Sequence, residues 1–163
     1  RSASLLLNYL NELQILGFQC PAKKNFRVFE PGCNCGELLF NFGDHYGAKI
    51  HGADIYEPAI KSAKNLDYLK EAEFECADVI QSDYLKKFPN RYFDIVFVSS
   101  HFTHIMHVPG LENYINELKR ISSIIVCVEI EKFAGRAPMS EHLKIWGFYC
   151  LVKDDITYGY FSH

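Results

Sequence analysis

The segment 28–38, with the sequence VFEPGCNCGEL, constrains the fold more than any other part of the chain. An apolar run leads into two glycines, Gly32 and Gly36, and a helical pattern follows to about Phe42. Glycines let the backbone turn sharply and approach a ligand closely, and the start of a helix offers free N–H groups. The segment therefore predicts a strand, a ligand-binding turn and a helix.

Glu30 lies two positions before Gly32, at the expected carboxyl end of the strand. A carboxylate there repels a pyrophosphate but attracts a cationic ligand. A dinucleotide motif G-x-G-x-x-G would also need glycines where the chain has Asn34 and Glu37. Charge and spacing both favour S-adenosylmethionine, which carries an ammonium and a sulfonium, over NAD.

Asp54 ends the segment AKIHGAD, a second strand candidate about twenty residues beyond the turn. An acid at this place accepts hydrogen bonds from both hydroxyls of a ribose. We expect Asp54 to bind the ribose of a nucleoside-bearing cofactor.

The two segments VFEPGCNCGELL and IHGADIYEPAIKSAK resemble the first and second motifs of the class I S-adenosylmethionine-dependent methyltransferases. The resemblance extends over about residues 26–162 and fits the small-molecule members best. Four later segments resemble further parts of the family in the same order: CADVIQ (76–81) the adenine segment, RYFDIVFVSS (91–100) the fourth strand, HIMHVPGLENYINELKRI (104–121) the loop and helix after it, and SEHLKIWGFYCLV (140–152) the penultimate helix and sixth strand.

The chain departs from the family at Asn34, where a glycine is usual, and in RISSIIVCVE, which lacks the glycine-rich turn before the fifth strand. An asparagine adopts the left-handed backbone conformation at more cost than glycine but more readily than other residues. We expect the cofactor turn to form with Asn34 in place.

Strands and helices alternate along the chain, which predicts a parallel sheet covered on both faces. With the resemblance, the fold class is α/β: a Rossmann-like, doubly wound, mostly parallel seven-stranded sheet that ends in an antiparallel hairpin around Asp154 and Asp155. We expect strands at about 26–30, 49–54, 73–76, 93–98 and 123–129, and helices at about 3–16, 36–46, 57–66, 81–87, 110–121 and 139–146.

The resemblance also implies the residues that contact the cofactor. The expected set is Glu30, Gly32, Asn34 and Gly36 at the turn, Asp54 and Ile55 beside the ribose, Asp78 and Val79 at the adenine, and Ser99 near the methionine part. Each of several residues has an alternative role: Glu30 and Asp54 as helix-capping or salt-bridge acids, Asp78 as a turn or N-cap aspartate, and Ile55 as a core residue.

Candidate bases lie in SSHFTHIMHVPG, just beyond the fourth strand, at the edge where open α/β sheets bind ligands. His101, His104 and His107 recur at every third position, and His107 matches a histidine common in the family. Each is a candidate base or substrate contact, with packing and surface roles as the alternative. No metal site is expected, because the nearest carboxylate is Glu112.

Methyl transfer from a sulfonium depends mainly on in-line positioning, and a base adds rate when the acceptor is a hydroxyl. We expect transfer to a small-molecule or carrier-borne acceptor, with a catalytically inactive binding or scaffolding subunit as the alternative. Nucleic acid is disfavoured, because the net charge is -3 and no Asn/Asp-Pro-Pro-aromatic motif follows the fourth strand.

The 163 residues suffice for one domain, with an N-terminal helix and entry loop at 1–25 and a cofactor-binding core at 26–163. No apolar run approaches the roughly 18 residues of a membrane span, so we expect a cytoplasmic protein with six reduced, mostly buried cysteines. The chain lacks an initiator methionine, and a piece of a longer protein is one expectation. Little sequence remains for a lid, so we expect an open active site. An open site suits a substrate carried on another protein, a large substrate, or completion by a partner domain or second subunit.

Overall fold

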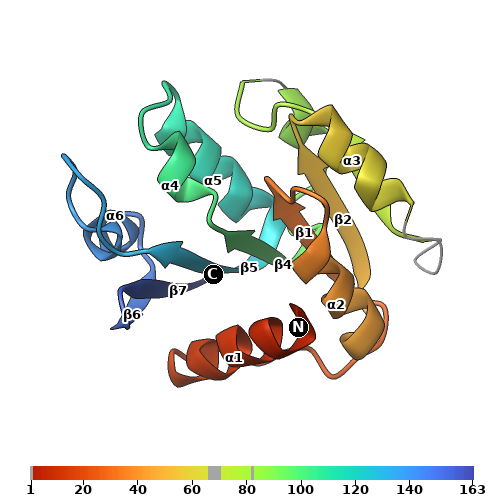
Figure 1. Cartoon of the computed structure of the whole chain (residues 1–163), viewed down its shortest axis with the longest axis horizontal. Coiled ribbons are helices and arrows are strands. Elements are labelled where there is room, and N and C mark those ends of the chain that lie inside the picture. Colours follow the sequence, from red (N-terminus) through yellow and green to blue (C-terminus); the bar gives the residue numbers. More distant parts are fainter. Residues whose placement is uncertain (1, 66–70, 82) are drawn as a thin grey trace.

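The computed structural model describes residues 2–65, 71–81 and 83–163. Strands and helices alternate along most of the chain, as the sequence predicts (Figure 1). The strands are β1 (Arg27–Pro31), β2 (Lys49–Asp54), β3 (Glu73–Cys76), β4 (Phe93–Ser99), β5 (Ser122–Ile130), β6 (Tyr149–Lys153) and β7 (Ile156–Ser162). The helices are α1 (Ser2–Ile15), α2 (Glu37–Tyr46), α3 (Glu57–Lys64), the 3-10 helix η1 (Asp83–Lys87), α4 (Phe102–Ile105), α5 (Leu111–Ile121) and α6 (Met139–Ile145).

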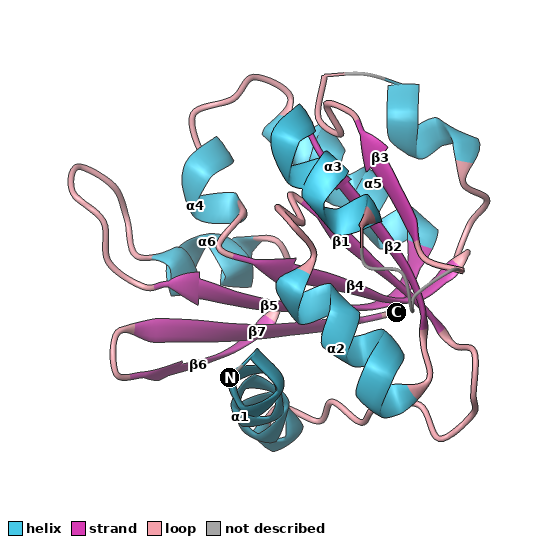
Figure 2. Ribbon diagram, turned by 45° about the vertical axis from the view of Figure 1, so that its right-hand side comes forward, coloured by secondary structure: helices cyan, strands magenta, loops and turns pink. Residues whose placement is uncertain are grey.

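The seven strands form one sheet in the order β3-β2-β1-β4-β5-β7-β6 (Figure 2). The first five strands are parallel, whereas β7 runs antiparallel to both β5 and β6. Asp154 and Asp155 connect β6 to β7 with φ of 52° and 61°, as a two-residue hairpin of the primed type requires. The predicted fold class is confirmed.

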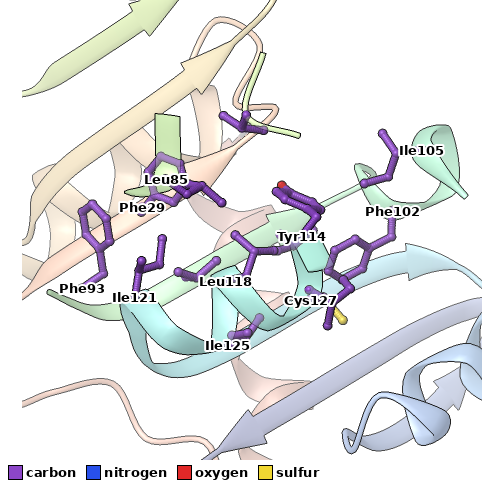
Figure 3. Close-up of a cluster of buried hydrophobic side chains, with 14 of the residues drawn as sticks. Phe29, Leu85, Phe93, Phe102, Ile105, Tyr114, Leu118, Ile121, Ile125 and Cys127 are labelled. Carbon is purple, nitrogen blue, oxygen red and sulfur yellow. The ribbon is translucent and has the colours of Figure 1, made fainter. Parts of the chain in front are cut away.

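Alternate residues of the central strands build two separate cores, because successive side chains of a strand point to opposite faces. Val28 packs in the core under α1, α2 and α3, while its neighbour Phe29 packs in the core under η1, α4, α5 and α6. Figure 3 shows the second core, where Tyr114 and Leu118 of α5 lie against the sheet. Helices therefore cover both faces, as predicted.

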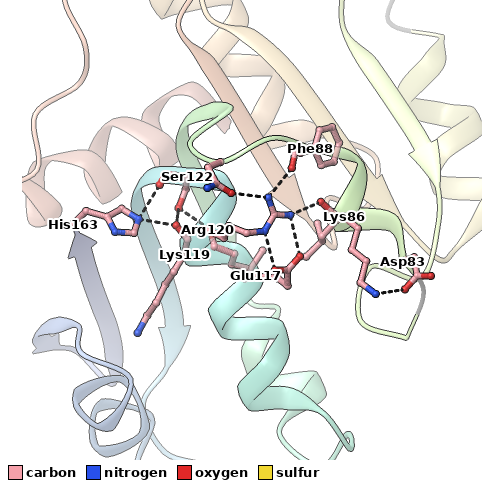
Figure 4. Close-up of polar contacts among 11 residues, drawn as sticks. Asp83, Lys86, Phe88, Glu117, Lys119, Arg120, Ser122 and His163 are labelled. Carbon is pink, nitrogen blue, oxygen red and sulfur yellow. Dashed lines mark hydrogen bonds and ion pairs between the residues drawn. The ribbon is translucent and has the colours of Figure 1, made fainter.

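Arg120, near the end of α5, joins that helix to the segment before β4 (Figure 4). Its guanidinium donates to the carbonyls of Phe88 (2.8 Å) and Leu85 (3.0 Å) and pairs with Glu117 (2.8 Å). Since Leu85 and Phe88 precede β4 in the chain, this network lies beside the start of that strand. It lies at the opposite edge from the carboxyl ends of the strands.

The structure corrects three details of the sequence prediction. The helix expected at 81–87 is the 3-10 helix η1, which ends before Pro89, and Ser82 lies outside the described residues. The short helix α4 was not predicted, because one turn is too short for an apolar stripe. The expectation of mostly buried cysteines is wrong, since only Cys33 and Cys127 are buried. Position 66, the expected end of the third helix, also lies outside the described residues.

No helix in the described part of the chain is long and apolar enough to cross a membrane.

Candidate functional site

A cavity of about 660 Å³ opens at the carboxyl edge of the sheet, where β1 and β4 lie side by side. At this position the chain order reverses, because β2 and β3 continue to one side and β5 to the other, which is where open α/β sheets bind ligands. Ten of the twelve predicted site residues line this cavity. They are Glu30, Gly32, Asn34, Asp54, Ile55, Asp78, Val79, Ser99, His101 and His104.

Glu30 of β1 faces this cavity from a buried position, with only 4% of its surface exposed. Its Oε1 atom has no hydrogen-bond partner among the described residues. Burial, and then the nearby charge of Asp54, raise the pKa of this carboxyl well above its usual value. An unpartnered buried carboxyl is costly, and a cation beside it removes that cost.

Asp54 at the end of β2 joins that strand to the cofactor turn, residues 32–36. Its two carboxylate oxygens accept the main-chain N–H groups of Asn34 (2.8 Å) and Tyr56 (2.9 Å). Asn34 has a φ of 52°, so the asparagine adopts the left-handed conformation that we expected. Gly36, with a φ of 76°, caps the start of α2 and lies outside the cavity wall.

The segment after β3 forms another wall of the cavity. Asp78 accepts the N–H groups of Ile80 and Gln81 (both 3.1 Å) through Oδ1, so it serves as a turn aspartate, the alternative that the sequence left open. Val79 is buried in the core, whereas Ile55 is 68% exposed and is therefore not a core residue. Both lie at the cavity.

The three predicted histidines lie in different surroundings. His101 is buried, its Nε2 atom is 2.8 Å from the Tyr114 hydroxyl, and burial lowers its pKa to about 4. His104 lies on α4, is exposed and lines the cavity. His107 is exposed and lies outside the cavity wall. Two of the three histidines, His101 and His104, therefore reach the cavity, and His107 does not.

Sequence reasoning missed Glu129 of β5, which holds the loop after β4. This buried carboxylate accepts the main-chain N–H groups of His101 (2.9 Å) and Thr103 (3.0 Å) and the Thr103 hydroxyl (2.8 Å). Burial raises the pKa of Glu129, and these hydrogen bonds offset part of that rise. A charged residue inside the apolar run VCVEI was the signal that could have found it.

The sheet order, the antiparallel seventh strand and a ligand cavity at the switch point define a Rossmann-like methyltransferase fold. A comparison with protein families gives the same class, because the model described as "Methyltransferase domain" matches residues 28–123, more than half of the chain. The chain belongs to this family, the class I S-adenosylmethionine-dependent methyltransferases.

Solved structures share the fold at low sequence identity. A SAM-dependent methyltransferase from Aquifex aeolicus superposes with a TM-score of 0.62 at 16% identity, over 93% of this chain and 87% of that one. Monomeric WbdD gives a TM-score of 0.73 at 18% identity, over 98% of this chain but only 40% of that one. A chain from the complex of the Haloferax volcanii Trm112 methyltransferase activator with a proposed methyltransferase gives 0.68 at 13% identity, over 100% and 94%.

Proposed function

We propose that this protein transfers a methyl group from S-adenosylmethionine, held in the cavity at the β1–β4 switch point, to a small-molecule or carrier-borne acceptor. When bound, the cofactor supplies a methyl group already activated on a sulfonium. The observation that carries the proposal is Glu30, a buried carboxyl at the cavity whose Oε1 atom has no partner in any residue that the structure describes. The cofactor's ammonium is the kind of group that this carboxyl accommodates.

The remaining cofactor contacts follow from the positions of the side chains around the cavity. Asp54 keeps lone pairs for ribose hydroxyls, since each of its oxygens accepts one main-chain N–H. Asp78, Val79 and Ile55 flank the adenine in this proposal. The turn from Gly32 through Asn34 to Gly36, together with Ser99, holds the methionine part.

We propose that His104 contacts the methyl acceptor, because it lines the cavity and is exposed to solvent. For a hydroxyl acceptor, His104 takes the proton as the oxygen attacks. The cofactor would supply the methyl group to the acceptor oxygen and would leave as a neutral thioether, while His104 would hold the acceptor's proton. His101 is a poorer base, since a pKa of about 4 makes its neutral form a weak proton acceptor.

A partner that completes the cavity is part of the proposal. Its support is the Haloferax volcanii complex, in which the Trm112 methyltransferase activator is bound to a proposed methyltransferase. That similarity concerns the fold, so activity assays of this chain alone and with candidate partner subunits are both needed.

Calorimetric titration with S-adenosylmethionine and S-adenosylhomocysteine tests the cofactor site. We expect micromolar binding to the native chain and a loss of about tenfold to a hundredfold in Glu30→Gln and Asp54→Ala, because each removes hydrogen bonds to a charged or polar ligand group. Asp44→Asn is the matched control, since Asp44 is an exposed acid on α2 outside the cavity.

A folded native chain that binds neither ligand would overturn the proposal and favour a scaffolding subunit. Binding that survives unchanged in Glu30→Gln would remove Glu30 from the cofactor site. Once binding is established, a screen of acceptors with native protein and His104→Ala measures whether that histidine serves the transfer.

A further inference from the structure

His101 lies between the cavity and the protein interior, held from two sides. Its ring packs edge-to-face on Tyr114, with ring centroids 5.8 Å apart, and its Nε2 atom is 2.8 Å from the Tyr114 hydroxyl. Its main-chain N–H donates to the buried carboxylate of Glu129. The ring and the backbone that carries it are therefore both fixed.

The Tyr114 hydroxyl determines which ring nitrogen of His101 carries the proton. Tyr114 is buried, and Nε2 of His101 is the one hydrogen-bond partner of its hydroxyl among the described residues. If Nε2 carried the proton, it would donate to the hydroxyl oxygen and leave the hydroxyl proton without an acceptor, at a cost. The arrangement that satisfies both groups has Tyr114 donating to Nε2, with the His101 proton on Nδ1.

The Nδ1 atom faces the cofactor turn. A Cβ atom added to Gly32 would lie 2.5 Å from Nδ1, so the ring packs directly on this glycine. Gly32 and His101 both line the cavity, and within the described chain no group is hydrogen-bonded to Nδ1. His101 thus presents an N–H donor at the turn.

The described residues around this turn offer an anionic ligand group no permanently charged donor. Of the described residues that line the cavity, none is a lysine or arginine. Three amides of the turn already donate within the protein: Cys33 to the Ala53 carbonyl, Asn34 to Asp54, and Gly36 to the Cys33 carbonyl. An amino-acid group brought in beside Glu30 carries a carboxylate as well as an ammonium, and the carboxylate needs a donor.

We propose that neutral His101 binds the carboxylate of the cofactor's methionine part through Nδ1–H, while Glu30 binds the ammonium. This inference rests on the proposed function, and it makes His101 a binding residue instead of a base. It predicts that the site selects ligands with an intact amino-acid group over nucleosides that lack the carboxylate.

Two variants of His101 test the roles of its two ring nitrogens separately. In His101→Gln the side-chain carbonyl can still accept from Tyr114, but nothing replaces the Nδ1 donor. In His101→Asn the amide nitrogen takes the place of Nδ1, and the bond to Tyr114 is lost. The ligands are S-adenosylhomocysteine and its decarboxylated analogue, which keeps the ammonium.

Calorimetry should show that the native chain prefers S-adenosylhomocysteine by about tenfold or more, since a hydrogen bond to a charged group contributes that much. His101→Gln should lose most of this preference by binding S-adenosylhomocysteine about tenfold more weakly, and should bind the decarboxylated analogue as the native chain does. His101→Asn should restore much of the preference. A preference that survives in His101→Gln would overturn the inference, and would point to the main-chain N–H groups of Glu37 and Leu38, which line the cavity at the start of α2.

Nitrogen NMR of the imidazole in the ligand-free protein provides a second, independent readout. A proton on Nδ1 supports the inference, and a proton on Nε2 overturns it. The two proposals fail differently. A native chain that does not bind S-adenosylhomocysteine removes the proposed function, whereas binding with a carboxylate preference that ignores His101 removes this inference alone.

Discussion

Two buried glutamates near the carboxyl ends of strands of the same sheet have opposite surroundings. Glu30 in β1 is 4% exposed, and its Oε1 atom has no partner among the described residues. Glu131, directly after β5, is 8% exposed and accepts the main-chain N–H of Ser140 (2.8 Å) and the hydroxyls of Ser140 (2.7 Å) and Thr157 (2.8 Å).

The two carboxyls titrate in opposite directions as a result. Burial raises the pKa of Glu30, and Asp54 raises it further. Burial alone would also raise the pKa of Glu131. The hydrogen bonds from Ser140 and Thr157 outweigh burial and lower the pKa of that carboxyl. Burial alone therefore does not identify a functional acid. What distinguishes the cavity carboxyl is that its Oε1 atom has no partner in the described part of the chain.

The largest effect that tests this comparison is expected at Glu131. In Glu131→Ala three buried donors of Ser140 and Thr157 lose their acceptor, so we expect a loss of about 3 kcal/mol in the free energy of unfolding, measured by urea denaturation at pH 7. Glu131→Gln keeps one carbonyl oxygen and should lose less. A change below about 0.5 kcal/mol in Glu131→Ala would show that these bonds do not stabilise the β5–β7 edge.

Glu30→Gln should raise the free energy of unfolding of the ligand-free protein, whereas Glu131→Ala lowers it. The folded-state pKa of Glu30 is raised, so its contribution to stability is complete below the unfolded pKa of about 4.3 and is lost as pH rises from that value through the folded pKa. We expect Glu30→Gln to be more stable than the native chain by about 1–2 kcal/mol at pH 8 and equal to it near pH 4.

Thermal denaturation across this pH range measures the effect, with Asp44→Asn as the exposed control. Equal stability of native and Glu30→Gln chains at pH 8 would mean that Glu30 has a partner in solution. A stabilised variant that no longer binds the cofactor would show that Glu30 is retained for the ligand at the expense of stability.

A smaller effect on stability is expected at Asn34. It tests whether the backbone conformation or the side chain of this residue matters for the cofactor turn. Asn34 is in the left-handed region at φ 52°, where alanine is strained and glycine is not. Asn34→Ala should lose about 1 kcal/mol of unfolding free energy, and Asn34→Gly should stay within about 0.5 kcal/mol of the native chain. Urea denaturation at pH 7 measures both, and equal losses would show that the asparagine side chain, not its conformation, matters.

Much of the fold could be predicted because its signals are local. The apolar run before Gly32 and the alternation of strands and helices gave the order of the elements, and Asp154-Asp155 gave the hairpin. The single turn of α4 could not be predicted, because it depends on Glu129, which accepts from His101 and Thr103 across 26 or more positions. One helical turn is too short for a helical pattern of apolar residues to be detected in the sequence.

The sequence by itself determined the class of protein and the residue types around the cofactor turn, since backbone freedom at Gly32 and charge at Glu30 are properties of single residues. Only the tertiary structure decided which of those residues have partners. Glu131 bonds Ser140 and Thr157, and His101 bonds Tyr114, whereas the Oε1 atom of Glu30 has no partner among the described residues. Such partners come together only once the strands and helices pack. That is why the three histidines, alike in spacing, have different surroundings in the fold.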